Sequence, residues 1–348
     1  MVKTYFLGAN SKDGFFSLYA GFPPDGAFLH ILKGGPGTGK SGFMRRIAQE
    51  AAARGMDTEQ VLCSGDPDSL DGVYIPQLAE AWVDGTAPHV VEPGIFGVFG
   101  DYVNLGQFCA LPLSPDEKEL AMRLSAEYKE QYRRAYGFLS AAASLRLACA
   151  PDLFGDEERS AIRKRVCGIL DRLPRRGATT DLPCRRLFLS ALSSAGSVRL
   201  NGSVSELCKL IYQFDDGLRG ADLALELVRQ EAEKRGACMI LCPQPLCPQR
   251  LEAALLPEYS LGFVGGAWEL PGARHFRLDR LISPDTQRLI RRELREGRRM
   301  ERDAAAAGLE RLRTAKALHD ELEAVYHPHM DFAALDEFTE RELLRVFA

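Results

Sequence analysis

Apolar and polar positions in the first third of the chain alternate as they do where strands and helices take turns. An apolar run over residues 28–32 predicts a buried strand, and apolar positions at helical spacing predict a helix from Gly42 to about Arg54. Shorter apolar runs predict strands at 59–63 and 78–83. Because strands separated by helices usually pair in parallel, we expect a mostly parallel sheet with its ligand at the carboxyl ends of the strands.

A glycine-rich segment joins the first of these strands to the helix and fits the pattern G-x-x-x-x-G-K-[ST]. Glycines let successive backbone N–H groups turn toward a polyphosphate, and the positive end of the following helix lies at the same point. We expect Lys40 to reach the β- and γ-phosphates of a nucleotide and the Ser41 hydroxyl to hold Mg²⁺. The flanking strand and helix patterns argue against a glycine-rich loop without a phosphate role. The predicted phosphate-binding residues are Gly34, Gly35, Pro36, Gly37, Thr38, Gly39, Lys40 and Ser41.

An aspartate, Asp84, directly follows the predicted strand 78–83. In P-loop enzymes such a carboxylate orients a water on Mg²⁺ or bonds the loop serine, so we predict Asp84 as a metal ligand beside Ser41 and as a catalytic residue beside Lys40. Many hydrolytic P-loop enzymes place a glutamate next to this aspartate, but Gly85 stands here. Three alternatives follow: hydrolysis is slow, another carboxylate such as Glu80 activates the water, or the phosphate acceptor is not water.

Three further side chains are candidate catalytic residues. Asp66 and Asp68 follow the strand 59–63 and could face the γ-phosphate or a substrate, although plain turn formation explains an Asp-Pro-Asp loop equally well. His89 could act in acid–base chemistry because histidine titrates near neutral pH, and a structural role is the alternative. The chain lacks the Asn-Lys-x-Asp element typical of guanine-specific proteins, so the predicted cofactors are ATP and Mg²⁺.

An internal repeat relates the two halves of the chain. Residues 186–196 align with 4–14 at an offset of 182, and later matches have an offset of 181. The copy of the glycine-rich loop, residues 215–222, contains acids and no Lys-Ser pair, and carboxylates repel a polyphosphate. The copy of Asp84 is absent as well, since glycines follow Val264. We interpret the second half as a duplicated fold that has lost its nucleotide site.

These patterns predict an α/β protein of two homologous P-loop NTPase-like halves with mostly parallel sheets, each followed by a helical appendage. The predicted segments are a P-loop nucleotide-binding domain over 1–114, a helical segment over 115–173, a linker over 174–183, a degenerate P-loop-like repeat over 184–283 and a C-terminal helical segment over 284–348.

Composition narrows the classes of partner. The 348 residues carry a formal net charge of -4, so nothing drives the whole chain toward nucleic acid or anionic membranes. Nine scattered cysteines fit a reducing cytoplasm, and no apolar run reaches the roughly 20 residues of a membrane span. Seven arginines between Arg288 and Arg302 form a basic helical stripe, which is more often a solvated face than a nucleic-acid site. We expect a cytoplasmic protein with no membrane partner and no nucleic acid.

Three segments, 31–41, 66–72 and 83–89, together resemble a family of tandem P-loop ATPases from Firmicutes whose members are usually described only as ATPases. The C-terminal segments 318–326 and 330–332 are similar to that family's tail. The resemblance implies the fold and ATP binding but no settled reaction. Members often keep a P-loop in both halves, and this chain departs from that pattern in its second half.

Three functions follow as hypotheses. The first is an ATPase or ATP-driven switch with one active site. The second is a small-molecule kinase that holds its acceptor near Asp66, Asp68 and His89. The third is a non-catalytic ATP-binding regulatory protein. A further substrate or protein partner is expected but not identified.

Overall fold

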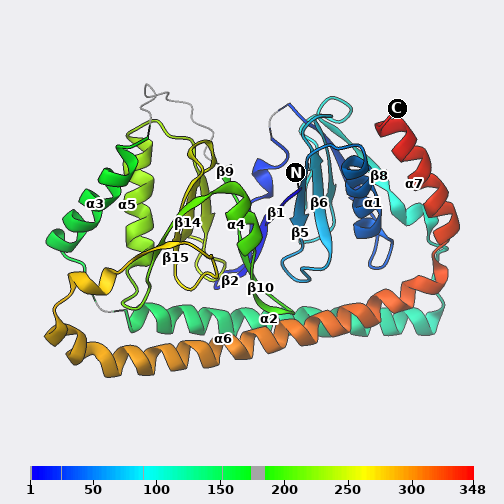
Figure 1. Cartoon of the computed structure of the whole chain (residues 1–348). Helices are drawn as coiled ribbons and strands as arrows, with labels where there is room; N and C mark the ends of the chain where they lie inside the picture. The colour runs from blue at the N-terminus through cyan, green and yellow to red at the C-terminus, as the bar shows by residue number, and fades with distance from the viewer. Residues whose placement is uncertain (1, 25, 89, 151, 174–184) are drawn as a thin grey trace.

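The computed structural model describes residues 2–24, 26–88, 90–150, 152–173 and 185–348 and is an α/β structure with two six-stranded sheets. Figure 1 shows two lobes side by side, each built on one sheet, with a pair of long helices running beneath both. Within the described ranges no helix combines the length and the apolar character that crossing a lipid bilayer requires.

The sheet of the first lobe is mixed, with three parallel and two antiparallel strand pairings. Its strands in spatial order are β1 (Val2–Phe6), β5 (Thr58–Leu62), β6 (Leu70–Ile75), β7 (Glu80–Asp84), β4 (Phe28–Lys33) and β8 (Gly100–Asn104). Strand β6 runs antiparallel to both neighbours, and the other three pairings are parallel. The connections on either side of β6 are too short for a crossover, which forces this antiparallel insertion. Helix α1 (Lys40–Ala53) packs on this sheet.

The second lobe repeats this arrangement. Its strands in spatial order are β9 (Arg185–Arg186), β13 (Ile240–Pro243), β14 (Leu251–Leu256), β15 (Leu261–Gly265), β12 (Leu210–Phe214) and β16 (Arg274–Phe276). Strand β14 takes the place of β6 and is the strand that is antiparallel to both neighbours. Helix α5 (Ala221–Glu233) packs on this sheet as α1 does on the first, and a short helix α4 (Asn201–Leu207) precedes β12.

Two hairpins lie between the lobes. Strands β2 (Gly8–Ser11) and β3 (Gly14–Ser17) form one, and β10 (Ser190–Ser193) and β11 (Gly196–Arg199) form the other. Short 3-10 helices complete the connections: η1 (Tyr19–Gly21), η2 (Leu105–Phe108), η3 (Pro257–Tyr259), η4 (Leu278–Leu281) and η5 (His327–His329).

The two long helices cross from one lobe to the other in opposite directions (Figure 1). Helix α2 (Pro115–Ala148) starts at a capping box of Ser114 and Glu117, and α6 (Pro284–Tyr326) starts at a Ser283 cap. Beyond α2, helix α3 (Asp156–Leu170) packs on α5 of the second lobe, and beyond α6, helix α7 (Phe332–Val346) packs on α1 of the first. The end of each helical segment therefore packs on the helix of the lobe formed by the other half of the chain.

Several boundaries differ from the sequence expectations. The segment expected as a helical stretch over 115–173 forms two helices, α2 and α3, and the predicted linker 174–183 lies outside the described residues. The chain after the Asp-Pro-Asp loop enters β6 at Leu70, a strand that was not among those predicted. Strand β8 was not predicted, because this edge strand carries only two buried residues, Gly100 and Val103.

Candidate functional site

The glycine-rich loop connects β4 to α1 at the carboxyl end of the first sheet. Gly37 and Gly39 have φ angles of 72° and 82°, a region that favours glycine. A Cβ at Gly34 would lie 2.4 Å from Thr38 Oγ1. Helix α1 starts after Gly39 with no side-chain cap and no acidic residue in its first turn. The loop therefore leaves the N-terminal N–H groups of α1 without a capping side chain, which is the arrangement that an anion can use.

Lys40 and Asp84 meet at this edge of the sheet. Strands β4 and β7 are neighbouring parallel strands with Leu32 opposite Asp84, so the loop and the aspartate leave the sheet side by side. The Lys40 ammonium donates to the carbonyls of Gly34 and Gly35 at 3.1 and 2.9 Å and lies 3.7 Å from Asp84 Oδ2. Their side chains are only 11% and 16% exposed, so the charge pair is partly shielded from water.

Ser41 and Asp84, the two predicted metal ligands, each have another partner. The Ser41 hydroxyl oxygen accepts a hydrogen bond from Leu70 N at 2.9 Å. Asp84 Oδ1 accepts from the backbone N and the hydroxyl of Thr86 at 2.8 and 2.6 Å. The Thr86 contacts fix the orientation of the Asp84 carboxylate and leave Oδ2 directed toward Lys40.

The position after Asp84 has no space for a side chain. A Cβ at Gly85 would lie 2.2 Å from Ile31 Cγ2 and 3.2 Å from Lys33 Nζ. Lys33 Nζ also donates to the Gly85 carbonyl at 3.0 Å. The packing of this strand end thus explains why the glutamate expected beside Asp84 is absent.

The candidates Asp66 and Asp68 lie on the loop between β5 and β6. Asp66 Oδ2 is 3.3 Å from Lys316 Nζ, so a lysine from α6 compensates its charge. Asp68 is exposed, its backbone N donates to Asp66 Oδ1 at 3.4 Å, and its carbonyl accepts from Arg45. Turn formation and the ion pair with Lys316 therefore explain most of the contacts that Asp66 and Asp68 make. His89, the remaining catalytic candidate, lies outside the described residues.

Glu80, proposed above as an alternative carboxylate, is far from the loop. It begins β7, whereas Asp84 ends it, and about 13 Å separates positions four residues apart on a strand. Its carboxylate lies 3.3 Å from His30 Nε2, and Asp101 Oδ1 lies 2.6 Å from the other ring nitrogen. Glu80 belongs to a buried histidine contact at the opposite end of the sheet.

A buried polar group lies behind the loop that carries Asp66. Asp71 is 5% exposed and accepts a hydrogen bond from the Tyr19 hydroxyl at 3.2 Å. Burial raises the pKa of the Tyr19 hydroxyl and of the Cys63 thiol, and the Asp71 carboxylate raises both further. Both groups therefore stay protonated at neutral pH, and Cys63 is a structural thiol rather than a nucleophile.

Sequence reasoning missed the contribution of α6 to this site. Glu323 Oε1 accepts a hydrogen bond from Gly37 N at 3.2 Å, and the His327 ring lies 2.9 Å from the point where a Cβ on Gly37 would be. The hydrogen bond from Gly37 to Glu323 joins residues 286 positions apart in the chain. Only the similarity of segment 318–326 to a family tail pointed to this region, and it gave no role to any residue.

Within the described ranges, one cluster besides Ser41 and Asp84 offers metal-binding groups. The ligand atoms of His319, Asp320 and Glu323 lie within 4.8 Å of one another. Asp320 pairs with Lys316 at 2.5 Å, and Glu323 accepts from the loop. His319 Nδ1 lies 3.7 Å from Glu323 Oε1, so each of the three groups already has a contact within the protein.

The corresponding loop of the second lobe, residues 215–220, differs in its chemistry. Asp216 Oδ1 accepts a hydrogen bond from Ala221 N at 3.2 Å, so the N-terminus of α5 already has a carboxylate from its own loop. Ala221 stands at the position of Lys40 and is buried, and Gly265 ends β15 where Asp84 ends β7. This lobe contains neither charge of the Lys40–Asp84 pair. Comparison of the chain with protein-family models, with curated proteins and with solved structures finds no match.

Proposed function

We propose that this protein binds Mg·ATP at the loop of its first lobe and acts as an ATPase or an ATP-driven switch with one active site. The observation that carries the proposal is the partly buried Lys40–Asp84 pair, 3.7 Å apart, at the adjacent ends of β4 and β7. This pair lies beside a helix whose N-terminus has no side-chain cap. A lysine, an aspartate and a helix N-terminus at one strand edge form the set of groups that P-loop proteins use for a nucleotide.

The residues present fit a triphosphate with its metal ion. The loop N–H groups and Lys40 would hold the phosphates, and Ser41 with Asp84 would hold Mg²⁺, which neutralises charge on the phosphate oxygens when bound. Lys40 now donates to two loop carbonyls, so its ammonium is already positioned within the loop. Asp84, held by Thr86, needs no side-chain rotation to keep facing Lys40.

We further propose that the two lobes arose by duplication and that the second is structural or regulatory. The two sheets have the same strand order and directions. The repeat places Gly39 and Gly220 in equivalent positions. Each lies against a segment that follows the other half of the chain. Added Cβ atoms would lie 2.7 Å from Leu335 and 2.4 Å from Phe154 respectively. The buried Ala221 and the Asp216 cap argue against a second triphosphate in the second lobe.

The acceptor of the γ-phosphate separates the proposed ATPase from a kinase. The crowded Gly85 excludes a glutamate beside Asp84, which favours slow hydrolysis or an acceptor other than water. A kinase is therefore the second candidate. Two carboxylates near the loop already have partners, because Asp66 pairs with Lys316 and Glu323 accepts from Gly37.

Titration calorimetry with Mg·ATP and phosphate release by the pure protein test the proposal. We expect binding and slow release by the native chain, and loss of both in Lys40→Ala. The control Lys118→Ala removes an exposed lysine on α2 and keeps both. Turnover that appears only with added metabolites supports the kinase, and tight binding without turnover supports a non-catalytic regulator. No binding of ATP by the native chain would refute all three.

A further inference from the structure

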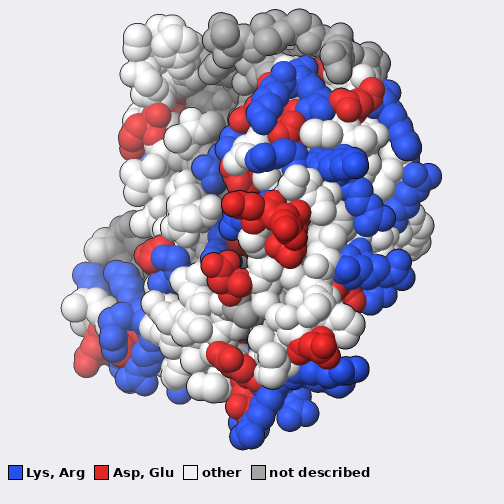
Figure 2. Space-filling model, turned by 90° about the vertical axis from the view of Figure 1, so that its left-hand side faces the viewer, with Lys and Arg blue, Asp and Glu red and all other residues white. Residues whose placement is uncertain are grey.

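A groove rich in arginine lies in the second lobe, at the end of the molecule that carries α3 and α5. It has a volume of about 890 Å³ and is lined by Arg146 of α2, residues 216–219 of the loop after β12, and residues of α6 between Pro284 and Arg302. We call it the arginine groove. Seven arginines and two carboxylates line it. Figure 2 views this end of the molecule and shows basic side chains along much of its edge, with acidic ones nearer the middle.

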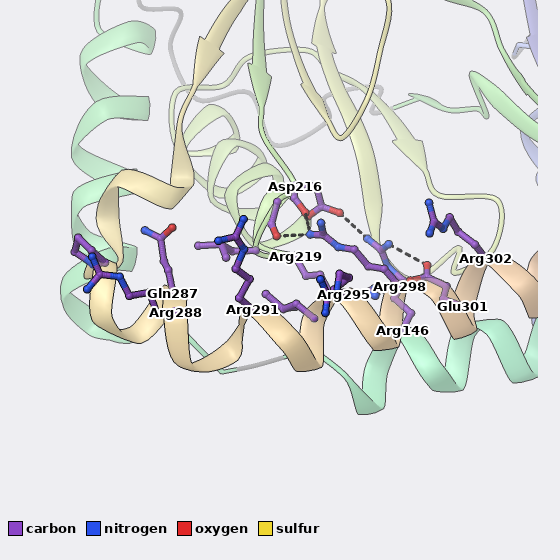
Figure 3. A pocket seen from close by; sticks show the side chains of 14 residues that line it. Arg146, Asp216, Arg219, Gln287, Arg288, Arg291, Arg295, Arg298, Glu301 and Arg302 are labelled. Atoms are coloured by element: carbon purple, nitrogen blue, oxygen red, sulfur yellow. Dashed lines mark hydrogen bonds and ion pairs between the residues drawn. The ribbon is translucent and has the colours of Figure 1, made fainter.

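Both carboxylates of the groove are already paired with two of its arginines. Arg146 lies 2.9 Å from Asp216 and 3.3 Å from Glu301, and Arg219 lies 2.6 Å from Glu301 (Figure 3). Burial alone would lower the pKa of Arg146, but the two carboxylates raise it above its ordinary value. The charges of Arg146, Arg219, Asp216 and Glu301 therefore nearly cancel. The net positive charge of the groove comes from its other arginines.

Arg219, which lines the groove, has an unfavourable backbone conformation and unpaired N–H groups. Its φ of 58° is in the left-handed region that non-glycine residues seldom adopt. Its side chain is 2% exposed, and Nε and Nη1 have no hydrogen-bond partner. A buried guanidinium with unpaired N–H groups costs free energy, and such orphaned donors mark positions where a ligand or water completes the structure.

Three of the five other arginines of the groove have no partner within the described residues, whereas Arg288 pairs with Asp285 and Arg298 donates to backbone carbonyls of the loop after β12. Arg291, Arg295 and Arg302 recur at spacings of four and seven residues, so they lie along one face of α6, as Figure 3 shows for the labelled side chains. No hydrogen bond or ion pair to another described side chain compensates them. In contrast, Arg292 on the outer side of the same helix pairs with Glu296 at 3.0 Å. Uncompensated like charges on one helix face are destabilising, which favours a bound anion.

We propose that the arginine groove binds a small molecule that carries two or more phosphate groups. Guanidinium groups form paired hydrogen bonds with phosphate oxygens, and a row from Arg291 to Arg302 spans about 16 Å along a helix. The cavity volume is within the range of small-molecule sites, roughly 300–1,000 Å³. The site is not a second P-loop, because Asp216 caps α5 where a phosphate would bind, and α6 supplies the cations instead.

The test uses the full chain with Lys40→Ala, so that the loop of the first lobe contributes little binding. Inorganic tripolyphosphate without Mg²⁺ is titrated by calorimetry at low salt. We expect binding, and a loss of about tenfold or more in affinity in the additional double variant Arg291→Gln/Arg295→Gln, since each removes a charge-assisted hydrogen bond. The matched control Arg292→Gln/Arg299→Gln removes the same charge from α6 outside the groove and leaves the affinity within about twofold.

Three outcomes would overturn the proposal. The first is no uptake of tripolyphosphate by the Lys40→Ala chain. The second is an equal loss in both double variants, which would mean attraction by overall charge rather than by the groove. The third comes from a labelled 20-nucleotide RNA in the same assay: binding of RNA but not tripolyphosphate, lost with Arg291 and Arg295, would identify a nucleic-acid surface. The four arginine substitutions change exposed residues, and thermal melting verifies that each variant and the Lys40→Ala chain are folded.

Discussion

Phe6 and Phe188 exchange both of their backbone hydrogen bonds, Phe6 N to Phe188 O at 2.9 Å and Phe188 N to Phe6 O at 2.8 Å. The internal repeat matches these residues at an offset of 182, so each pairs with its own equivalent. Both side chains are fully buried and lie in a small core with Ala9 and Ala191, which the same offset also matches. The two lobes thus meet at a point where the chain contacts its own copy.

Truncating this contact should weaken the whole molecule. We expect Phe188→Ala to lower the free energy of unfolding by about 3–5 kcal/mol, the usual cost of removing a buried aromatic ring. Urea unfolding followed by circular dichroism measures it. The control Phe99→Ala removes a ring that is 54% exposed and should change stability by about 0.5 kcal/mol or less. A similar small change in both variants would show that the junction contributes little.

The carboxylate of Glu323 accepts a hydrogen bond from a loop N–H that the proposed triphosphate would use. Since it accepts from Gly37 N, a bound triphosphate must displace it and meets its negative charge. We expect Glu323→Gln to bind ATP several-fold more tightly, as measured by calorimetry. Glu321→Gln changes the same charge two residues away on an exposed position and should leave affinity unchanged. Weaker binding in Glu323→Gln would instead assign this carboxylate a supporting role.

Crowding at Gly85 predicts a local overpacking effect. Gly85→Ala places a Cβ 2.2 Å from Ile31 Cγ2, so we expect a loss of about 1–3 kcal/mol in stability together with weaker ATP binding, because Asp84 must move. Gly168→Ala in α3 meets no atom within 4 Å and should stabilise by about 0.5–1 kcal/mol. Chemical unfolding of the two variants side by side gives the comparison, and equal effects would contradict the prediction.

Glu252 makes stability depend on pH. This residue of β14 is buried, and burial raises the pKa of its carboxyl from 4.5 to about 7 against the opposing Ser190 hydrogen bond. Between these two values the unfolded chain loses a proton that the folded protein keeps, so stability falls as pH rises. The loss amounts to about 3 kcal/mol by pH 7 and above.

Unfolding free energies at pH 5 and pH 8 test this dependence. Glu252→Gln keeps an acceptor for Ser190 and carries no ionisable group, so its stability should fall less than that of the native chain between these pH values. The exposed substitution Glu206→Gln serves as the control and should retain the native difference. An unchanged pH difference in Glu252→Gln would assign the effect to another group.

Local patterns sufficed for the strand, loop and helix that contain Lys40, because the motif and its apolar flanks are contiguous in the chain. They failed for β6, where Leu70-Asp71-Gly72 looks like a turn until Tyr19 and neighbouring strands bury it. They also failed for Glu323, since a side chain on a long polar helix gives no local sign of the loop that it will meet. Contacts between distant segments depend on how the long helices pack across both lobes. A short stretch of sequence does not predict that packing.

Helix α6 extends for 43 residues, about 64 Å, without interruption. Its first part supplies Arg298 to the carbonyls of Asp216 and Gly217, and its last part supplies Glu323 to Gly37. If ligands bind at both proposed sites, a shift of α6 at one end would change the contacts that the same helix makes at the other end. By thermodynamic reciprocity, whatever advantage one anion gives the other is returned in equal measure, which would make the helix a two-way coupling between the lobes.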